Sequence, residues 1–296
     1  MKWEGNRESE NVEDRRGQNG GGGGGGGFNI GGGKIGIGTI VIALIGSAIF
    51  GVNPLTVLGM MGGEGGPVAQ QAPAQASGPP AQDKNIRFVR TVLADTEDVW
   101  AKQFSERNAQ YAKPTLTVFD GGRTPTGCGT GQSASGPFYC PADQKVYIDL
   151  SFYETMQKQF GVTGEFAQAY VIAHEIGHHV QNQLGISDKV HAARQQGSER
   201  QANAMSVKLE LQADCFAGLW AFHSNQARGI LETGDVEGAL KAAAAIGDDA
   251  LQRKSQGHVV PDSFTHGTSE QRSRWFTVGL ESGQMEKCNT FEARNL

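Results

Sequence analysis

The sequence predicts a helix-rich α+β domain, preceded by a disordered glycine-rich segment and one transmembrane helix. Three observations support this prediction. Glycine is concentrated before residue 66, a long run without charged residues follows, and charged and aromatic residues mostly lie after residue 83. The C-terminal part, about 210 residues long, is large enough to bury roughly 70% of its unfolded surface. We therefore expect the folded domain at residues 83–296.

Residues 1–34 are polar at first and then dominated by glycine, with an unbroken glycine tract at residues 20–27. Such a segment cannot bury enough apolar surface to offset the entropy that it loses on ordering. We expect residues 1–34 to be disordered.

The next segment, residues 35–61, contains no charged residue and consists mostly of Ile, Val, Leu, Ala and Gly. A membrane-spanning helix needs about 20 apolar residues, and this run is long enough. A cleaved signal peptide is disfavoured because the run is too long and starts too far into the chain. A buried helix of a soluble domain is disfavoured by the length. The segment therefore predicts a single transmembrane anchor in the lipid bilayer.

The distribution of basic residues predicts the orientation of this anchor. Basic residues in short flanking segments favour the cytoplasmic side of a membrane. Five precede the span, whereas the first one after it is Lys84. We expect a cytoplasmic N-terminus and a bacterial domain that is periplasmic or extracellular, held off the membrane by a Gly/Pro/Ala-rich linker at residues 62–82.

The domain itself shows helical and extended patterns in a mixed order. Apolar spacing predicts helices at residues 86–104, 151–160, 165–184, 198–227, 235–245 and 269–280. Residues 115–119 and 145–150 have the composition and alternation of β-strands. Short strands followed mainly by helices indicate an α+β domain.

Charge and cysteine content narrow the class of protein. The net charge of -5 and the pI near 5.8 argue against a nucleic-acid partner, since no basic stripe is present.

No C-x-x-C pair occurs, so a thiolate zinc site is not expected. Cys128 and Cys140 form a plausible disulfide in an oxidising compartment. Cys215 fits a small buried hydrophobe, and its pairing with Cys288 stays open.

A metal-site pattern occurs within the predicted helix at residues 165–184. His174 and His178 are four residues apart and therefore share one helix face, with Glu175 beside them. This is the H-E-x-x-H arrangement of two zinc ligands and a general base. The flanking residues are apolar, and burying such polar groups is costly unless they bind a metal or are otherwise paired. The alternative is a helix whose His and Glu only satisfy hydrogen bonds in the core.

A third ligand is expected on a later helix. The extended pattern with a third histidine fails, because position 184 is Leu. Glu210 fits as the third ligand, and Asp214, one turn later, as a hydrogen-bond partner of a ligand imidazole. The alternative is a solvated charge pair on a helix face. With three protein ligands and one open position, the set predicts one catalytic Zn²⁺ ion.

The Glu210-x-x-Ala-Asp214 element after H-E-x-x-H resembles the gluzincin peptidases, especially membrane-associated enzymes of the CaaX-prenyl-peptidase type. From about residue 85 to the C-terminus, the chain resembles the bacterial family described as putative neutral zinc metallopeptidases. The segments that carry this resemblance are Cys128-Gly-Thr-Gly-Gln, Phe138-Tyr-Cys-Pro-Ala-Asp, Ala173-His-Glu-Ile-Gly-His-His and Phe264-Thr-His-Gly-Thr-Ser-Glu-Gln-Arg. The resemblance implies a zincin-like metallopeptidase domain.

Thr265-His266-Gly267 and Arg272 look like the Thr-His-Pro…Arg element of the CaaX-type enzymes. The resemblance implies that His266 stabilises an oxyanion and that Arg272 organises the site. The chain departs from the pattern at Gly267, where Pro is usual. The alternative is a loop His followed by a helix with Ser269 as N-cap. Weaker oxyanion candidates are Tyr147, Tyr153 and His223.

Taken together, these patterns predict a membrane-anchored zinc peptidase with Glu175 as general base. Residues 145–150 are expected as an edge strand that binds an extended peptide. The main alternative is a zinc-binding envelope module without hydrolytic activity, such as a chaperone or scaffold. Glu175 argues against it, since this residue is not a ligand and has no structural need to lie beside the open position. A purely structural membrane protein would bind no metal.

Overall fold

The computed structural model describes residues 1–17, 83–120 and 122–296. The expected transmembrane helix at residues 35–61 and the linker at residues 62–82 lie outside the described residues. Among the helices of the described ranges, none combines the length and the hydropathy of a membrane span.

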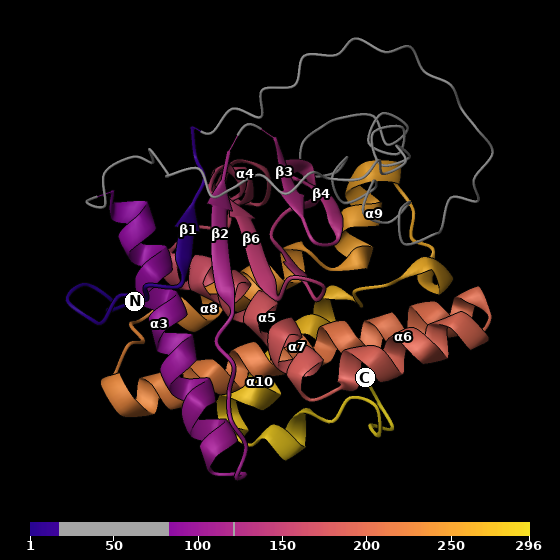
Figure 1. The fold of residues 1–296 in the computed structure, drawn as a ribbon. Helices are drawn as coiled ribbons and strands as arrows, with labels where there is room; N and C mark the ends of the chain where they lie inside the picture. The colour runs from indigo at the N-terminus through magenta and orange to yellow at the C-terminus, as the bar shows by residue number, and fades with distance from the viewer. Residues whose placement is uncertain (18–82, 121) are drawn as a thin grey trace.

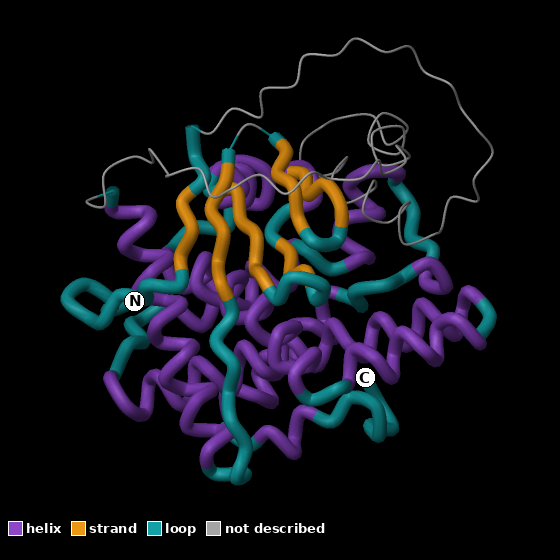
Figure 2. Tube along the Cα trace, in the orientation of Figure 1, coloured by secondary structure: helices purple, strands orange, loops and turns teal. Residues whose placement is uncertain are grey.

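The described residues form a helix-rich α+β fold, in which the strands gather on one side of the helices (Figures 1 and 2). The strands are β1 (Val12–Asp14), β2 (Thr115–Phe119), β3 (Arg123–Thr126), β4 (Gly129–Gln132), β5 (Phe138–Cys140) and β6 (Lys145–Asp149). The helices are α3 (Lys84–Ser105), α4 (Ser151–Phe160), α5 (Glu165–Gln183), α6 (Ile186–Gln196), α7 (Glu199–Arg228), α8 (Asp235–Ala245), α9 (Asp248–Gln256) and α10 (Ser269–Ser282). Short 3₁₀ turns are η1 (Ser133–Ser135), η2 (Pro261–Ser263) and η3 (Met285–Cys288).

The six predicted helices and both predicted strands are present, with ends that differ by at most two residues. Helices α6 and α9 were not predicted. Both are short and largely exposed, and α6 buries only Val190, so neither has an apolar stripe in the sequence.

The main sheet has the strand order β1-β2-β6-β5. Strand β2 runs parallel to β1 and β6, whereas β5 is antiparallel to β6. The expectation that residues 145–150 form an edge strand is wrong, because β6 pairs on both sides. On this side of the described sheet the edge strand is β5, and the opposite edge is β1. Both strands have only three residues, a pattern too short to be recognised from sequence.

The N-terminal segment is part of the folded domain, so the expectation of disorder for residues 1–34 is wrong for residues 1–17. Trp3 is 3% exposed, packs edge-on against Phe88, and donates from Nε1 to Glu165 Oε2 at 2.8 Å. Strand β1 extends the sheet beyond β2. The composition of this segment is polar, but the burial of Trp3 and the pairing of β1 are enough to order residues 1–17.

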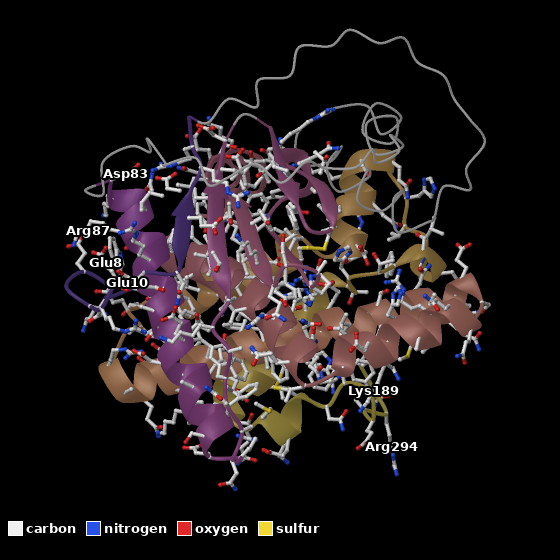
Figure 3. The ribbon with its side chains drawn as sticks, viewed as in Figure 1. Glu8, Glu10, Asp83, Arg87, Lys189 and Arg294 are labelled. Atoms are coloured by element: carbon white, nitrogen blue, oxygen red, sulfur yellow. A yellow bond between two sulfur atoms is a disulfide. The ribbon has the colours of Figure 1, made fainter. Side chains whose placement is uncertain are left out.

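Ion pairs hold the same segment to α3. Arg7 Nη2 contacts Glu97 at 3.0 Å and Asp98 at 2.6 Å, and Arg16 Nη1 lies 2.8 Å from Asp83. Figure 3 shows a further pair, Glu8 and Arg87, near the start of α3. Because Arg16 contacts Asp83, the described residues on either side of residues 18–82 lie close together.

Three glycines let the central helices approach closely. A Cβ atom at Gly177 of α5 would lie 3.0 Å from the carbonyl oxygen of Ala213 in α7. At the crossing of α7 and α10, Gly218 faces the backbone of Phe276, and Gly279 faces the backbone of Cys215. These close crossings bring the polar residues of the three helices to one place.

Two disulfides are present. Cys128–Cys140 joins the β3–β4 hairpin to β5, with a Cα–Cα distance of 5.8 Å. Cys215–Cys288 joins α7 to the C-terminal turn η3, with a Cα–Cα distance of 5.5 Å.

Candidate metal centre and active site

The predicted ligands converge on one point between α5 and α7. His174 and His178 lie one turn apart on α5, and Glu210 faces them from α7. Glu210 Oε2 lies 3.2 Å from His174 Nε2, and Glu210 Oε1 lies 3.5 Å from His178 Nε2. One atom from each of the three residues falls within 4.8 Å of the others. Two imidazoles and a carboxylate are a donor set that suits zinc.

The second nitrogen of each ring supports this assignment. His174 Nδ1 lies 2.8 Å from Asp214 Oδ1, and His178 Nδ1 lies 2.9 Å from Gln181 Oε1. Each acceptor holds a proton on Nδ1 and leaves Nε2 free to face Glu210. The lone pairs of the two Nε2 atoms and of the Glu210 carboxylate converge, and they repel one another unless a cation lies between them. The three residues therefore fit a bound zinc ion.

Charge around His174 also fits a cation site. Burial by itself lowers the pKa of His174, but the charge and hydrogen bond of Asp214 outweigh it and raise that pKa to about 10. Burial raises the pKa of Glu210, and the facing histidines more than reverse this, holding it well below its usual value. The site is therefore built to hold positive charge, which a metal ion supplies in exchange for protons.

Asp214 is the centre of a buried network. It is fully buried and accepts from Arg272 Nε at 2.8 Å, from Arg272 Nη2 at 2.9 Å and from the Tyr170 hydroxyl at 2.6 Å. The two bonds from Arg272 form the strong bidentate pairing of guanidinium and carboxylate. Burial raises the pKa of Asp214, but Arg272 and His174 outweigh it and lower that pKa to about 2. Arg272 is thus linked to His174 through Asp214.

Glu175 lies on the same helix as the two histidines and lines the same cavity. Its exposure is 8%, and burial raises the pKa of its carboxyl above the ordinary value. A raised pKa brings a carboxylate closer to the proton affinity that a general base needs near neutral pH. Glu175 is not among the three converging ligands.

His266 lines this cavity as well, and Asp248 holds its loop. Asp248 Oδ2 accepts the backbone N–H groups of residues 265–267 at 2.7–3.0 Å, and Oδ1 lies 3.2 Å from His266 Nδ1. Burial lowers the pKa of His266, but Glu210 and Asp248 raise it above its usual value. Asp248 was not identified from sequence, since it lies 18 residues upstream of His266 and no local pattern links the two.

Gly267 explains the departure from the Thr-His-Pro pattern. Its φ is +92°, which Pro cannot adopt, and its N–H donates to Asp248 at 3.0 Å, which Pro cannot do. The alternative with Ser269 as N-cap is wrong by one residue. Thr268 is the N-cap of α10 and forms a capping box with Gln271.

The cavity has a volume of about 520 Å³ and lies between α5, β5 and the β3–β4 hairpin. Its wall is largely apolar and includes Phe138, Tyr139, Phe152, Val171, Ile246 and Leu251. The weaker oxyanion candidates do not line it. The Tyr147 hydroxyl donates to Asp143, the His223 ring donates to Gly283 O, and Tyr153 on α4 packs against the hydrophobic core.

His179 fixes the edge strand to the metal-binding helix. It is fully buried, its Nε2 donates to Ala112 O at 2.6 Å, and its Nδ1 lies 3.1 Å from the Tyr139 hydroxyl. Burial lowers the pKa of His179, so the ring is neutral and Nδ1 accepts from Tyr139. The residue beside the second ligand therefore holds β5 at the cavity.

Comparison with known proteins agrees with this geometry. Residues 1–291 match the model of a family described as "Putative neutral zinc metallopeptidase". The chain belongs to this family. It is 52% identical to protein YpfJ of Escherichia coli strain K12, over 98% of this chain and 99% of that protein. It is 43% identical to protein Rv2575 of Mycobacterium tuberculosis strain H37Rv, over 63% of this chain and 65% of that protein. No solved structure matches the chain.

Proposed function

We propose that this protein hydrolyses peptide bonds with Glu175 as general base. The observation that carries this proposal is the position of Glu175, which lines the cavity beside three converging ligands without being one of them. A zinc ion held by His174, His178 and Glu210 would supply Lewis acidity, lowering the pKa of water toward about 7 and polarising a carbonyl group.

In this proposal one residue of the chain transfers the protons and another stabilises the negative charge that develops on the substrate oxygen. Glu175 takes a proton from the attacking water and delivers it to the leaving nitrogen. His266, which lines the cavity, donates a hydrogen bond to the oxyanion, an effect of about 3–4 kcal/mol for one such donor. Asp248 orients His266, and Arg272 with Asp214 orients His174.

We propose that the substrate binds as an extended peptide along β5. Among the described strands, β5 pairs only with β6, and residues 137–139 line the cavity. An exposed strand edge binds a peptide through main-chain hydrogen bonds, and side-chain pockets add selectivity. The apolar wall of the cavity favours apolar side chains in the substrate.

The test uses the full chain loaded with zinc, with casein as an unfolded substrate. We expect the wild type to cleave casein, a chelator to abolish cleavage, and Glu175→Gln to lose at least about a hundredfold in kcat, in line with the loss of a general base. The matched control is Glu154→Gln on α4, which changes an exposed Glu whose salt bridge among the described residues is with Lys158. Full activity of Glu175→Gln would overturn the proposal. Zinc binding without cleavage by the wild type would favour the non-hydrolytic envelope module.

We further propose that residues 35–61 associate with the lipid bilayer, and that residues 1–17 share a compartment with the domain. The contacts of Trp3, β1 and Arg16 support this orientation, because a single span would separate the segment from its partners. Two of the basic residues that predicted a cytoplasmic N-terminus have carboxylate partners in the domain, Arg7 with Glu97 on α3 and Arg16 with Asp83 at its N-cap. Two disulfides favour an oxidising compartment outside the cytoplasm.

Labelling with a membrane-impermeant maleimide tests this orientation in spheroplasts. Glu10→Cys and Lys189→Cys place single thiols on exposed residues of the N-terminal segment and of α6 (Figure 3). We expect both variants to be labelled equally before lysis. Labelling of Lys189→Cys alone would restore the single-pass orientation with a cytoplasmic N-terminus.

A further inference from the structure

The hydrogen bond between His178 and Gln181 belongs to a longer chain of buried amides. Gln181 follows His178 by three residues on α5, so the two side chains share a helix face. Gln181 is fully buried, and its Oε1 lies 2.9 Å from His178 Nδ1. No part of the catalytic scheme above uses this side chain.

The neighbours of Gln181 fix the orientation of its amide group. Gln181 Nε2 lies 2.7 Å from the carbonyl oxygen of Leu209 and 3.1 Å from Gln212 Oε1. A carbonyl oxygen only accepts, so the NH₂ group must face Leu209. Oxygen Oε1 is then left to face His178. The ring must donate to it, which puts the proton of His178 on Nδ1.

The amide group of Gln212, the hydrogen-bond partner of Gln181 on the side away from His178, is oriented in the same way. Gln212 is 5% exposed, and its Nε2 donates to the carbonyl oxygen of Cys288 at 3.0 Å. Its Oε1 is thereby left to accept from Gln181. Cys288 is tied to α7 by its disulfide with Cys215. The direction of the donors therefore follows from two main-chain carbonyl groups, that of Leu209 in α7 and that of Cys288 in the C-terminal turn η3.

We propose that Gln181 and Gln212 are positioning residues of the metal centre, which hold His178 in the tautomer with a free Nε2. This inference rests on the proposed zinc site. If either amide turned over, two oxygens would face each other in a buried place, at a cost of about 1–3 kcal/mol for the unsatisfied groups. The Nδ1 proton of His178 is therefore held in place before a metal binds, and Nε2 is the nitrogen that faces Glu210.

Competition with a chromophoric chelator, applied to the full chain, measures the zinc dissociation constant. We expect Gln181→Leu to bind zinc about 10–100-fold more weakly than the wild type, the usual effect of losing the partner of a ligand histidine. Gln212→Leu should have a smaller effect, since Gln181 still bonds Leu209. The matched control is Gln103→Leu on α3, a buried Gln that bonds His223 and does not line the cavity, and its zinc affinity should be unchanged.

A second readout reports the tautomer directly. In the zinc-loaded wild type, ¹⁵N–¹H correlation spectra should show the His178 proton on Nδ1 and the ligating nitrogen at Nε2. Ligation through Nδ1 would overturn the inference even if Gln181→Leu failed to fold. Wild-type affinity in both Gln181→Leu and Gln212→Leu would also overturn it. A wild-type protein that bound no zinc would instead overturn the proposed function. This outcome is distinct from the loss of the positioning role of Gln181 and Gln212, which requires a wild type that binds zinc.

Discussion

The two histidines of the metal centre are supported by opposite kinds of neighbour. His174 donates to Asp214, a fully buried carboxylate that is neutralised by a bidentate bond from Arg272. His178 donates to Gln181, a neutral amide that is oriented by a carbonyl group and by a second amide. The contact of His174 with Asp214 depends on charge, and it needs the counter-charge that Arg272 supplies. The contact of His178 with Gln181 depends only on the direction of hydrogen bonds.

The difference follows from the charge that the site holds. Two charges of a zinc ion would be balanced by Glu210 and Glu175, while Arg272 balances Asp214. A second carboxylate in place of Gln181 would leave a buried negative charge without a partner, which costs several kcal/mol. The neutral amide gives His178 a fixed direction without disturbing that balance. We therefore expect the charged support to be more sensitive to substitution than the amide support.

The largest effect is expected for Asp214→Asn. The change leaves Arg272 buried without its counter-charge, which should lower the free energy of unfolding by about 3–5 kcal/mol. Urea denaturation of the metal-free protein measures this loss. Asp188→Asn on α6, where the side chain is exposed, is the matched control and should change stability little. A loss at Asp214 no larger than that of Gln181→Leu would contradict the comparison.

The pH dependence of stability gives an effect of intermediate size. The pKa of Asp214 is about 2 in the folded protein and 3.8 when unperturbed, so the folded state binds its proton less readily. Ionised Asp214 thus contributes about 2 kcal/mol above pH 4, and this contribution is lost as the pH falls from about 4 to 2.

Denaturation of the metal-free protein at several pH values between 2 and 5 tests this expectation. The acid-induced loss should be present in the wild type and in Gln181→Leu, because the amide does not titrate. It should be reduced in Asp214→Asn. A Gln181→Leu protein that lacked the acid-induced loss would show that the two supports are not independent.

The smallest effect is expected for Tyr170→Phe. This change removes one donor from Asp214 and keeps both bonds from Arg272. The free energy of unfolding should fall by about 1–2 kcal/mol, near the lower end of the range for a hydrogen bond to a charged group, because both bonds from Arg272 remain. Zinc affinity should change by less than in Gln181→Leu. A loss as large as that of Asp214→Asn would mean that the hydroxyl group, and not Arg272, keeps the carboxylate ionised.

Several parts of the molecule were determined by local patterns in the sequence. The helical spacing of His174 and His178 puts both rings on one face, and Asp214 follows Glu210 by one turn on another apolar helix. The strand at residues 115–119 and the long helices were predicted for the same reason, since each element has a period that a short window contains. The resemblance to the family described as putative neutral zinc metallopeptidases is confirmed by the family match.

Tertiary structure decided the rest, because the partners are distant in sequence and no period connects them. Asp248 meets His266 only where α9 packs near α10, and Gln212 meets Cys288 across 76 residues. The polar composition of residues 1–17 predicted disorder, yet Trp3 is buried and β1 completes the sheet. A strand's place in a sheet depends on which neighbours pair with it, and for this reason β5, and not β6, lies at the edge of the described sheet beside the cavity.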